Sequence, residues 1–168
     1  MAKDNQATEN QAAENQAAEE QQNGQAGFAI EKLYVKDASI EVPSAPQIFT
    51  NRTAPQINVE LANSASRLDE GVFEVSIKVT VTAKIEETTA FLVEVTQSGI
   101  FAIRGIPDDN LEVVLAITCP NILFPYAREA VSDMVTRAGF MPVLLNPINF
   151  EALYAQQKMD QNTSQTPS

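Results

Sequence analysis

Histidine is absent from this sequence, and cysteine occurs once, as Cys119. Without histidine the chain lacks the side chain that most often serves as general base, as metal ligand and as a proton switch near neutral pH. A single cysteine excludes an internal disulfide and any metal cluster held by several thiolates. These absences argue against an enzyme, and they predict that the protein uses no metal and no cofactor.

Long apolar runs and an excess of basic residues are also missing. No uninterrupted apolar stretch approaches the roughly 20 residues of a membrane span, and residues 1–6 lack the apolar centre of a signal peptide. We therefore expect no membrane insertion and a cytoplasmic location, where the thiol stays reduced. Lysine and arginine number 11 against 22 acidic residues, a net charge of −11. This balance argues against nucleic acid as a partner and suits a basic one.

Two polar segments flank one expected domain. Residues 1–27 repeat Asn-Gln-Ala and hold no apolar residue larger than alanine between Met1 and Phe28. Such a segment buries too little surface to offset its chain entropy, so we predict a disordered tail; a helix is the alternative, because Ala, Gln and Glu favour helices. Residues 158–168 are predicted to be a flexible tail, which leaves residues 28–157 as the folded domain.

Four segments show the period of two that is typical of β-strands. They are residues 28–42, 57–61, 72–85 and 90–97, and every odd position from 73 to 85 is apolar. Turns are expected at residues 69–71 and 86–87. Strands that alternate in this way form an antiparallel sheet with one packed and one solvated face. Because helical spacing begins after about residue 108, we predict an α+β fold: a four-stranded antiparallel sheet with one face covered by C-terminal helices.

The helical part of the chain is interrupted by prolines. Residues 111–118 are predicted to form a helix that ends at a break at Pro120. A second helix carries an apolar stripe from residue 123 to residue 135, with Pro125 in its first turn and Gly139 as its stop.

An apolar loop precedes the last predicted helix. Residues 140–148 are too apolar for an ordinary surface connection, and two prolines keep them irregular. Asn149 is then placed to cap a helix that carries Phe150, Leu153 and Tyr154 on one face.

No group of residues predicts catalysis. The acidic pairs Glu86-Glu87 and Asp108-Asp109 fall in expected turns and are interpreted as solvated charges. Cys119 precedes Pro120 in an apolar context, and without histidine to activate it we interpret it as a small buried residue.

Two surfaces remain as candidates for binding. The first is apolar and consists of the 140–148 loop, the start of the last helix and a second proline-bounded loop after the first strand. Its predicted residues are Val42, Ile48, Phe49, Phe140, Met141, Leu144, Leu145, Ile148, Phe150 and Tyr154. If part of this area stays accessible, it marks an interaction site that suits many apolar side chains. The alternative is that all of these residues fill the core.

The second surface is acidic and lies on the sheet. Asp37 and Glu41 share the odd face of the first strand with Leu33 and Val35, while Leu92 and Glu94 share one face of the fourth. Acidic residues beside apolar ones would suit a partner with basic and apolar groups. The alternative is a solvated sheet face without a partner.

The run Cys119-Pro-Asn-Ile-Leu-Phe-Pro-Tyr-Ala-Arg-Glu129, with Gly99-Ile-Phe-Ala-Ile103 before it and Pro147-Ile-Asn-Phe150 after it, resembles SecB, the family of bacterial protein-export chaperones. The similarity runs from about residue 28 to residue 157 and implies the same α+β fold in a homotetramer, a dimer of dimers. It further implies a chaperone that holds unfolded precursor polypeptides without ATP or cofactor and passes them to the ATPase SecA.

The resemblance also assigns residues. The family's SecA-contacting positions match Asp37, Glu41, Leu92 and Glu94, and its substrate groove matches the region from Phe140 to Tyr154. The loop that begins at Gly139 differs in sequence from the usual loop of the family, and the N-terminal segment is longer than the family's usual one. Two rival functions remain: a SecB-like chaperone dedicated to one client, such as an antitoxin, and a small enzyme or ligand-binding domain with a closed polar pocket.

Overall fold

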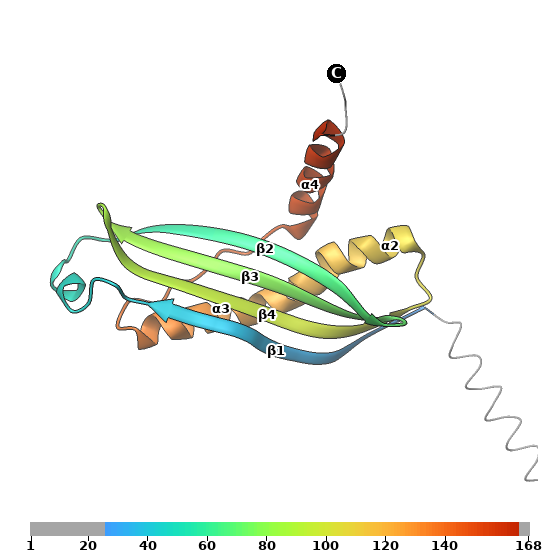
Figure 1. Cartoon of the computed structure of the whole chain (residues 1–168), viewed down its shortest axis with the longest axis horizontal. Helices are drawn as coiled ribbons and strands as arrows, with labels where there is room; N and C mark the ends of the chain where they lie inside the picture. The colour runs from blue at the N-terminus through green and yellow to red at the C-terminus, as the bar shows by residue number, and fades with distance from the viewer. Residues whose placement is uncertain (1–25, 165–168) are drawn as a thin grey trace, which may run out of the picture.

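A computed structural model describes residues 26–164 of the chain. The predictions for residues 1–25 and 165–168 lie outside the described residues. Four strands form the sheet: β1 (Gly27–Glu41), β2 (Gln56–Asp69), β3 (Val72–Ile85) and β4 (Thr88–Arg104). All neighbours are antiparallel in the order β1-β4-β3-β2, and helix α3 crosses one face (Figure 1). The predicted α+β fold is confirmed.

Strands β2 and β4 are longer than their sequence patterns predict. β2 continues past Leu61 through small and polar residues because β3 pairs with it along its whole length, up to Asp69. β4 continues through Gly99, where an added Cβ would lie 2.8 Å from the Phe101 ring and 3.0 Å from the Leu33 side chain. The close approach of those two side chains therefore requires glycine at position 99.

The strict alternation predicted for β1 is wrong, because the strand contains two irregularities. Its register against β4 shifts between Ile30 and Lys32 and again between Val35 and Asp37. An inserted residue reverses the faces of all that follow. Asp37 consequently lies on the face away from the helices, whereas Leu33 packs against the core on the helix side. The expectation that Leu33 and Val35 share a face with Asp37 is corrected.

The two prolines do not break the helical layer. Helix α2 (Asp108–Val113), the π-helical turn η2 (Val114–Thr118) and helix α3 (Cys119–Arg137) follow one another without a gap. Pro120 falls in the first turn of α3, directly after the wider π turn, where its missing N–H is tolerated. The predicted break at Pro120 is wrong, and so is the start at Pro125, which lies inside α3.

The helical run from Asp108 to Arg137 is the core helix of the domain. The run is 30 residues long and contains an 18-residue window with a mean hydropathy of 1.2, so by length and composition alone it could cross a membrane. Packing explains part of this apolar composition, because α3 buries one stripe of side chains against β3 and β4, whereas α2 and η2 contain no fully buried residue. The stripe consists of Cys119, Pro120, Leu123, Phe124, Ala127, Val131 and Val135.

At the C-terminal end of the fold the predicted helix stop at Gly139 and the predicted cap at Asn149 are confirmed, and the last helix is longer than predicted. Gly139 (φ 91°) stops the run after α3, and its N–H donates to the Thr136 carbonyl. Asn149 Oδ1 accepts a hydrogen bond of 3.0 Å from the Ala152 N–H, which is the predicted cap. Helix α4 (Phe150–Ser164) extends away from the sheet and enters the segment predicted as a tail (Figure 1). A short 3-10 helix, η1 (Gln47–Thr50), lies between β1 and β2.

Candidate functional site

A groove runs along the helix side of β2. Three cavities of about 250, 290 and 310 Å³ lie between this strand and the helical layer, and each shares lining residues with the next. The strand supplies Val59, Leu61 and Asn63 as one wall. The opposite wall comes from η2, the loop before α4 and the first turns of α4. The groove exists because α3 covers β3 and β4 and leaves β2 uncovered.

One end of the groove is apolar and the other is polar. At the apolar end Val59 and Leu61 face Phe124, Leu145 and Ile148. The polar end is named for its polar side chains, which lie beside Ala65, Leu115 and Ala116 and come from β2, α2 and α4: Asn63, Ser64, Glu112, Tyr154, Gln157, Lys158 and Gln161. The groove therefore offers apolar surface for side chains and amide groups that can bond a peptide backbone.

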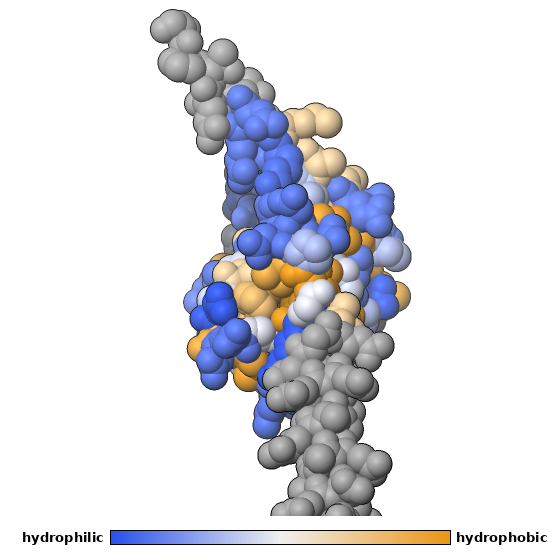
Figure 2. All heavy atoms as spheres, turned by 90° about the vertical axis from the view of Figure 1, so that its right-hand side faces the viewer, coloured by the Kyte–Doolittle hydropathy of each residue, from blue (hydrophilic) through white to orange (hydrophobic). Residues whose placement is uncertain are grey.

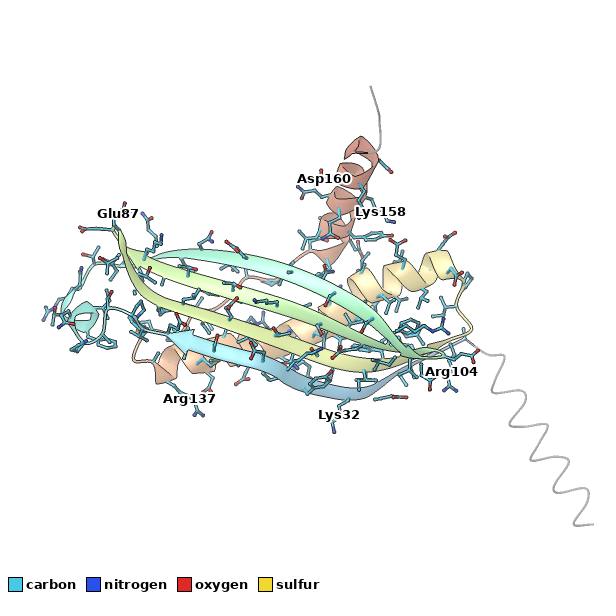
Figure 3. The ribbon with its side chains drawn as sticks, viewed as in Figure 1. Lys32, Glu87, Arg104, Arg137, Lys158 and Asp160 are labelled. Atoms are coloured by element: carbon cyan, nitrogen blue, oxygen red, sulfur yellow. The ribbon has the colours of Figure 1, made fainter. Side chains whose placement is uncertain are left out.

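A salt bridge joins α4 to α2 at the polar end. Lys158 Nζ lies 2.6 Å from Glu112 Oε1, and the same ammonium lies 5.5 Å from the centre of the Tyr154 ring (Figure 3). The hydrogen bond from Lys158 lowers the pKa of the Glu112 carboxyl. Figure 2 shows apolar residues gathered at the foot of α4, whose own surface is hydrophilic. Both side chains are about half-exposed, so this contact contributes little to the stability of the fold.

Four of the ten residues predicted for the apolar surface line the groove. They are Leu145, Ile148, Phe150 and Tyr154. Phe150 is only 2% exposed and meets the Phe124 ring edge-on at 6.1 Å, so it forms the base of the groove and belongs also to the core.

The other predicted residues lie at the end of the sheet near η1, outside these cavities. Phe140 packs between Phe49 and Phe91, with ring centres 5.1 and 4.9 Å away. Ile48 is 6% exposed and Val42 is half-buried against the core. Two loop residues are open to solvent, Met141 at 85% and Leu144 at 78% exposure.

Sequence reasoning missed the β2 wall of the groove. Val59 and Leu61 belong to the alternating pattern of the strand, and this pattern alone predicts that both point to the packed face. Their partial exposure depends on where α3 lies, and no local pattern encodes this. Exposed apolar residues at a sheet edge are the signal, and they become visible only after the strand order is known.

The four residues predicted for the acidic surface come together on the open face of the sheet. Glu41 pairs with Leu92 across β1 and β4, and Ser39 pairs with Glu94 one step further along. Asp37 follows opposite Thr96, on the same side. The face opposite the helices thus carries three carboxylates and one half-buried leucine within three successive rows of the sheet.

Several charges on the open face are already paired. Lys78 Nζ lies 2.7 Å from Glu94 Oε2, and the Thr80 hydroxyl donates to the same oxygen at 3.1 Å. The hydrogen bond from Lys78 lowers the pKa of Glu94. Further along the sheet, Glu74 accepts hydrogen bonds from the Tyr34 hydroxyl and from Lys36.

Cys119 carries no sign of chemical reactivity. Its side chain is fully buried in the core, and burial raises the pKa of the thiol to about 12. At neutral pH it is a protonated, inaccessible thiol, which fits the interpretation of a small core residue.

Comparison with known proteins places the chain in a family. The family model described as preprotein translocase subunit SecB matches residues 20–161. The protein-export protein SecB of Methylobacillus flagellatus is 62% identical over 140 residues, which cover 83% of this chain and 89% of that protein. The protein-export protein SecB of Aromatoleum aromaticum is 63% identical over 138 residues, 82% of this chain and 87% of that one.

A solved structure supports the fold. The SecB-like chaperone of Mycobacterium tuberculosis, in complex with a peptide from the HigA1 antitoxin, superposes with a TM-score of 0.61 over 72% of this chain and 90% of that one, at 18% sequence identity. Taken with the sheet order, the uncovered groove and the match over residues 20–161, these relatives establish that the chain belongs to the SecB family of protein-export chaperones.

Proposed function

We propose that the β2 groove holds extended segments of unfolded precursor polypeptides and that the open face of the sheet binds SecA. The protein would act in the cytoplasm as a homotetramer, without ATP and without a cofactor. The observation that carries this proposal is the uncovered apolar wall of β2, Val59 and Leu61, facing Ile148 across an open groove. A folded client hides the apolar side chains that such a wall would bind, so the groove selects unfolded chains.

The edge position of β2 supports binding of an extended client. β2 pairs only with β3 and is the last strand of the sheet, so one row of its N–H and C=O groups has no partner strand among the described residues. A client segment that pairs with this edge would place alternate side chains toward the groove. Backbone pairing is independent of sequence, and this suits a chaperone with many clients.

Assembly is supported by the apolar residues on the opposite edge. Phe28, Ile30 and Val35 lie on the helix side of β1 and are about half-exposed in the single chain. Such residues favour contact with a further copy of the chain. Four copies would present four grooves, and a long client that occupies several of them gains affinity through effective concentration without new contacts.

General export is favoured over a dedicated client. The neighbour solved with an antitoxin peptide is 18% identical and shows only a shared fold. The relatives named protein-export protein SecB share 56–63% identity.

The test measures aggregation of a slowly refolding client by light scattering, with the full chain and no nucleotide. Leu61→Asp places a charge in the groove and removes apolar contact of about 1.5–3 kcal/mol. We expect at least a tenfold loss of client affinity. Ala62→Asp is the matched control, because the neighbouring residue points to the other face of β2. Equal holding by both variants, with the assembly intact, would refute the groove.

A further inference from the structure

Lys78 lies among the carboxylates proposed for the SecA surface. Lys78 of β3 pairs with Thr96 of β4, which pairs in turn with Asp37 of β1. The next row across the three strands is Thr80, Glu94 and Ser39. Lys78 therefore stands one row from Glu94 and in the same row as Asp37. The register of the sheet, rather than a loop, fixes it there.

The ammonium of Lys78 forms an ion pair with the Glu94 carboxylate. The two groups are 2.7 Å apart, and the Thr80 hydroxyl binds the same carboxylate oxygen at 3.1 Å. A basic side chain of a partner that approaches Glu94 meets a carboxylate already neutralised, with a like charge beside it. It has to displace Lys78 before it can form its own ion pair.

The Lys78–Glu94 ion pair contributes little to the stability of the fold. Both side chains are accessible, Lys78 at 49% and Glu94 at 34%, and ion pairs so exposed contribute little to folding. The opposite face of the same strands is fully buried at Val79 and Val93 and supplies the packing that holds them together. A binding role is the simpler reason for a cation at this point.

We propose that Lys78 is an internal competitor for Glu94 that weakens SecA docking and makes it sensitive to salt. This inference rests on the proposed function, since it names the regulation of the proposed SecA surface. A docking face with Asp37, Glu41 and Glu94 free would bind a basic partner tightly and release it slowly. Lys78 lowers the affinity without a change of shape, which suits a delivery step that has to be reversible.

The first experiment measures SecA affinity of full-length variants by titration calorimetry at low and high salt. Lys78→Met keeps the aliphatic stem and removes the charge; we expect about threefold to fivefold tighter binding at low salt. The gain should shrink as salt rises, because exposed charges are screened. Lys36→Met is the matched control: it removes the same charge on the same face, from a lysine that pairs with Glu74 at 2.9 Å.

A double-mutant cycle separates competition from a mere change of net charge. If Lys78 occupies Glu94, Glu94→Gln costs more affinity in the Lys78→Met background than in the wild type. Additive effects, or a gain from Lys36→Met as large as from Lys78→Met, would overturn the inference. Weaker binding by Lys78→Met would overturn it too. Absence of any SecA binding by the wild-type chain would instead overturn the proposed docking function itself, and this inference with it.

Discussion

The two faces of the sheet are made from the same strands, yet their side chains are held in different ways. On the helix side of β3 and β4 most residues are valines, alanines, isoleucines and phenylalanines with almost no exposure, and Gln97 is the buried polar exception on this side among the described residues. On the open side the same strands carry threonines, lysines and glutamates that bond to one another at the surface. Stability is concentrated on one face, so the charges of the other can vary without loss of the fold.

A second difference lies within the helix side itself. The middle strands are covered by α3, and the outer strands β1 and β2 are covered only in part. Ile57 and Val59 on β2, like Phe28 and Ile30 on β1, remain more than two-fifths exposed. A helix layer narrower than the sheet therefore yields both the core and the two apolar margins that we propose bind client and further copies of the chain.

The largest expected effect is on the free energy of unfolding, and it compares one substitution on each face at neighbouring positions of β3. Val81 is fully buried, whereas Thr82 faces the open side. Val81→Asp buries an unpaired charge and should cost about 5 kcal/mol or more, enough to abolish folding of many domains. Thr82→Asp should stay within about 1 kcal/mol of the wild type.

The measurement is urea unfolding followed by circular dichroism. Since Val81→Asp could fail to fold at all, Val81→Thr provides a milder form that should lose about 1–3 kcal/mol by burying a hydroxyl. Equal urea midpoints for Val81→Thr and wild type would mean that this face is not the core.

Binding should depend on the open face in a position-specific way. Leu92 is half-buried between Glu41 and Thr82, in the set proposed for SecA. Leu92→Arg introduces a like charge toward a basic partner and removes an apolar contact, so we expect at least a tenfold loss of SecA affinity with client holding unchanged. Ile100→Arg is the control on the same face of β4, outside the proposed set. Pull-down and calorimetry measure the SecA affinity of both variants. An equal loss of affinity in the two would mean that the residues proposed to bind SecA are not the right ones.

Regular periodicity was the part of the fold that the sequence encoded well. β3 was predicted with its bounds because its alternation is complete, and the α+β class followed from strands preceding helices. β1 was predicted to exist but its faces were partly wrong, since two irregularities in pairing reverse the alternation. Pro120 and Pro125 were interpreted as helix limits; the π turn and the first-turn position accommodate one of them, and the other is carried inside α3 at its exposed side.

The candidate sites show the same division. The prediction placed Asp37 with Glu41 and Leu92 with Glu94 because residues two or four apart share a face where no irregularity lies between them, and the pairing of β1 with β4 brings the two sets together. The groove was predicted only from its loop side, through Leu145 and Ile148. Its β2 wall depends on the strand order and on the width of the helix layer, which are properties of the whole fold. Met141 and Leu144 look alike in sequence to Leu145, and only packing distinguishes them.

The smallest expected effect is a pH dependence of stability that comes from Glu74 on the open face. Hydrogen bonds from Tyr34 and then from Lys36 lower the pKa of Glu74 in the folded protein. The folded state thus favours the ionised carboxylate, so its stabilising contribution is present above the unfolded pKa of about 4.3 and is lost as the pH falls through the lower folded value. The stability difference between wild type and Glu74→Gln should therefore be greatest near neutral pH and shrink below about pH 4.

Tyr34→Phe tests the cause of this pH dependence, because it removes the first donor to Glu74 and leaves Lys36 in place. Urea midpoints from pH 3 to pH 7 for both single variants and the double variant measure it. We expect the pH-dependent part of the Tyr34→Phe effect to vanish in the Glu74→Gln background, since the phenol then has no carboxylate to stabilise. An unchanged pH dependence in that background would assign it to a titratable group other than Glu74, and the explanation through the Tyr34–Glu74 hydrogen bond would fail.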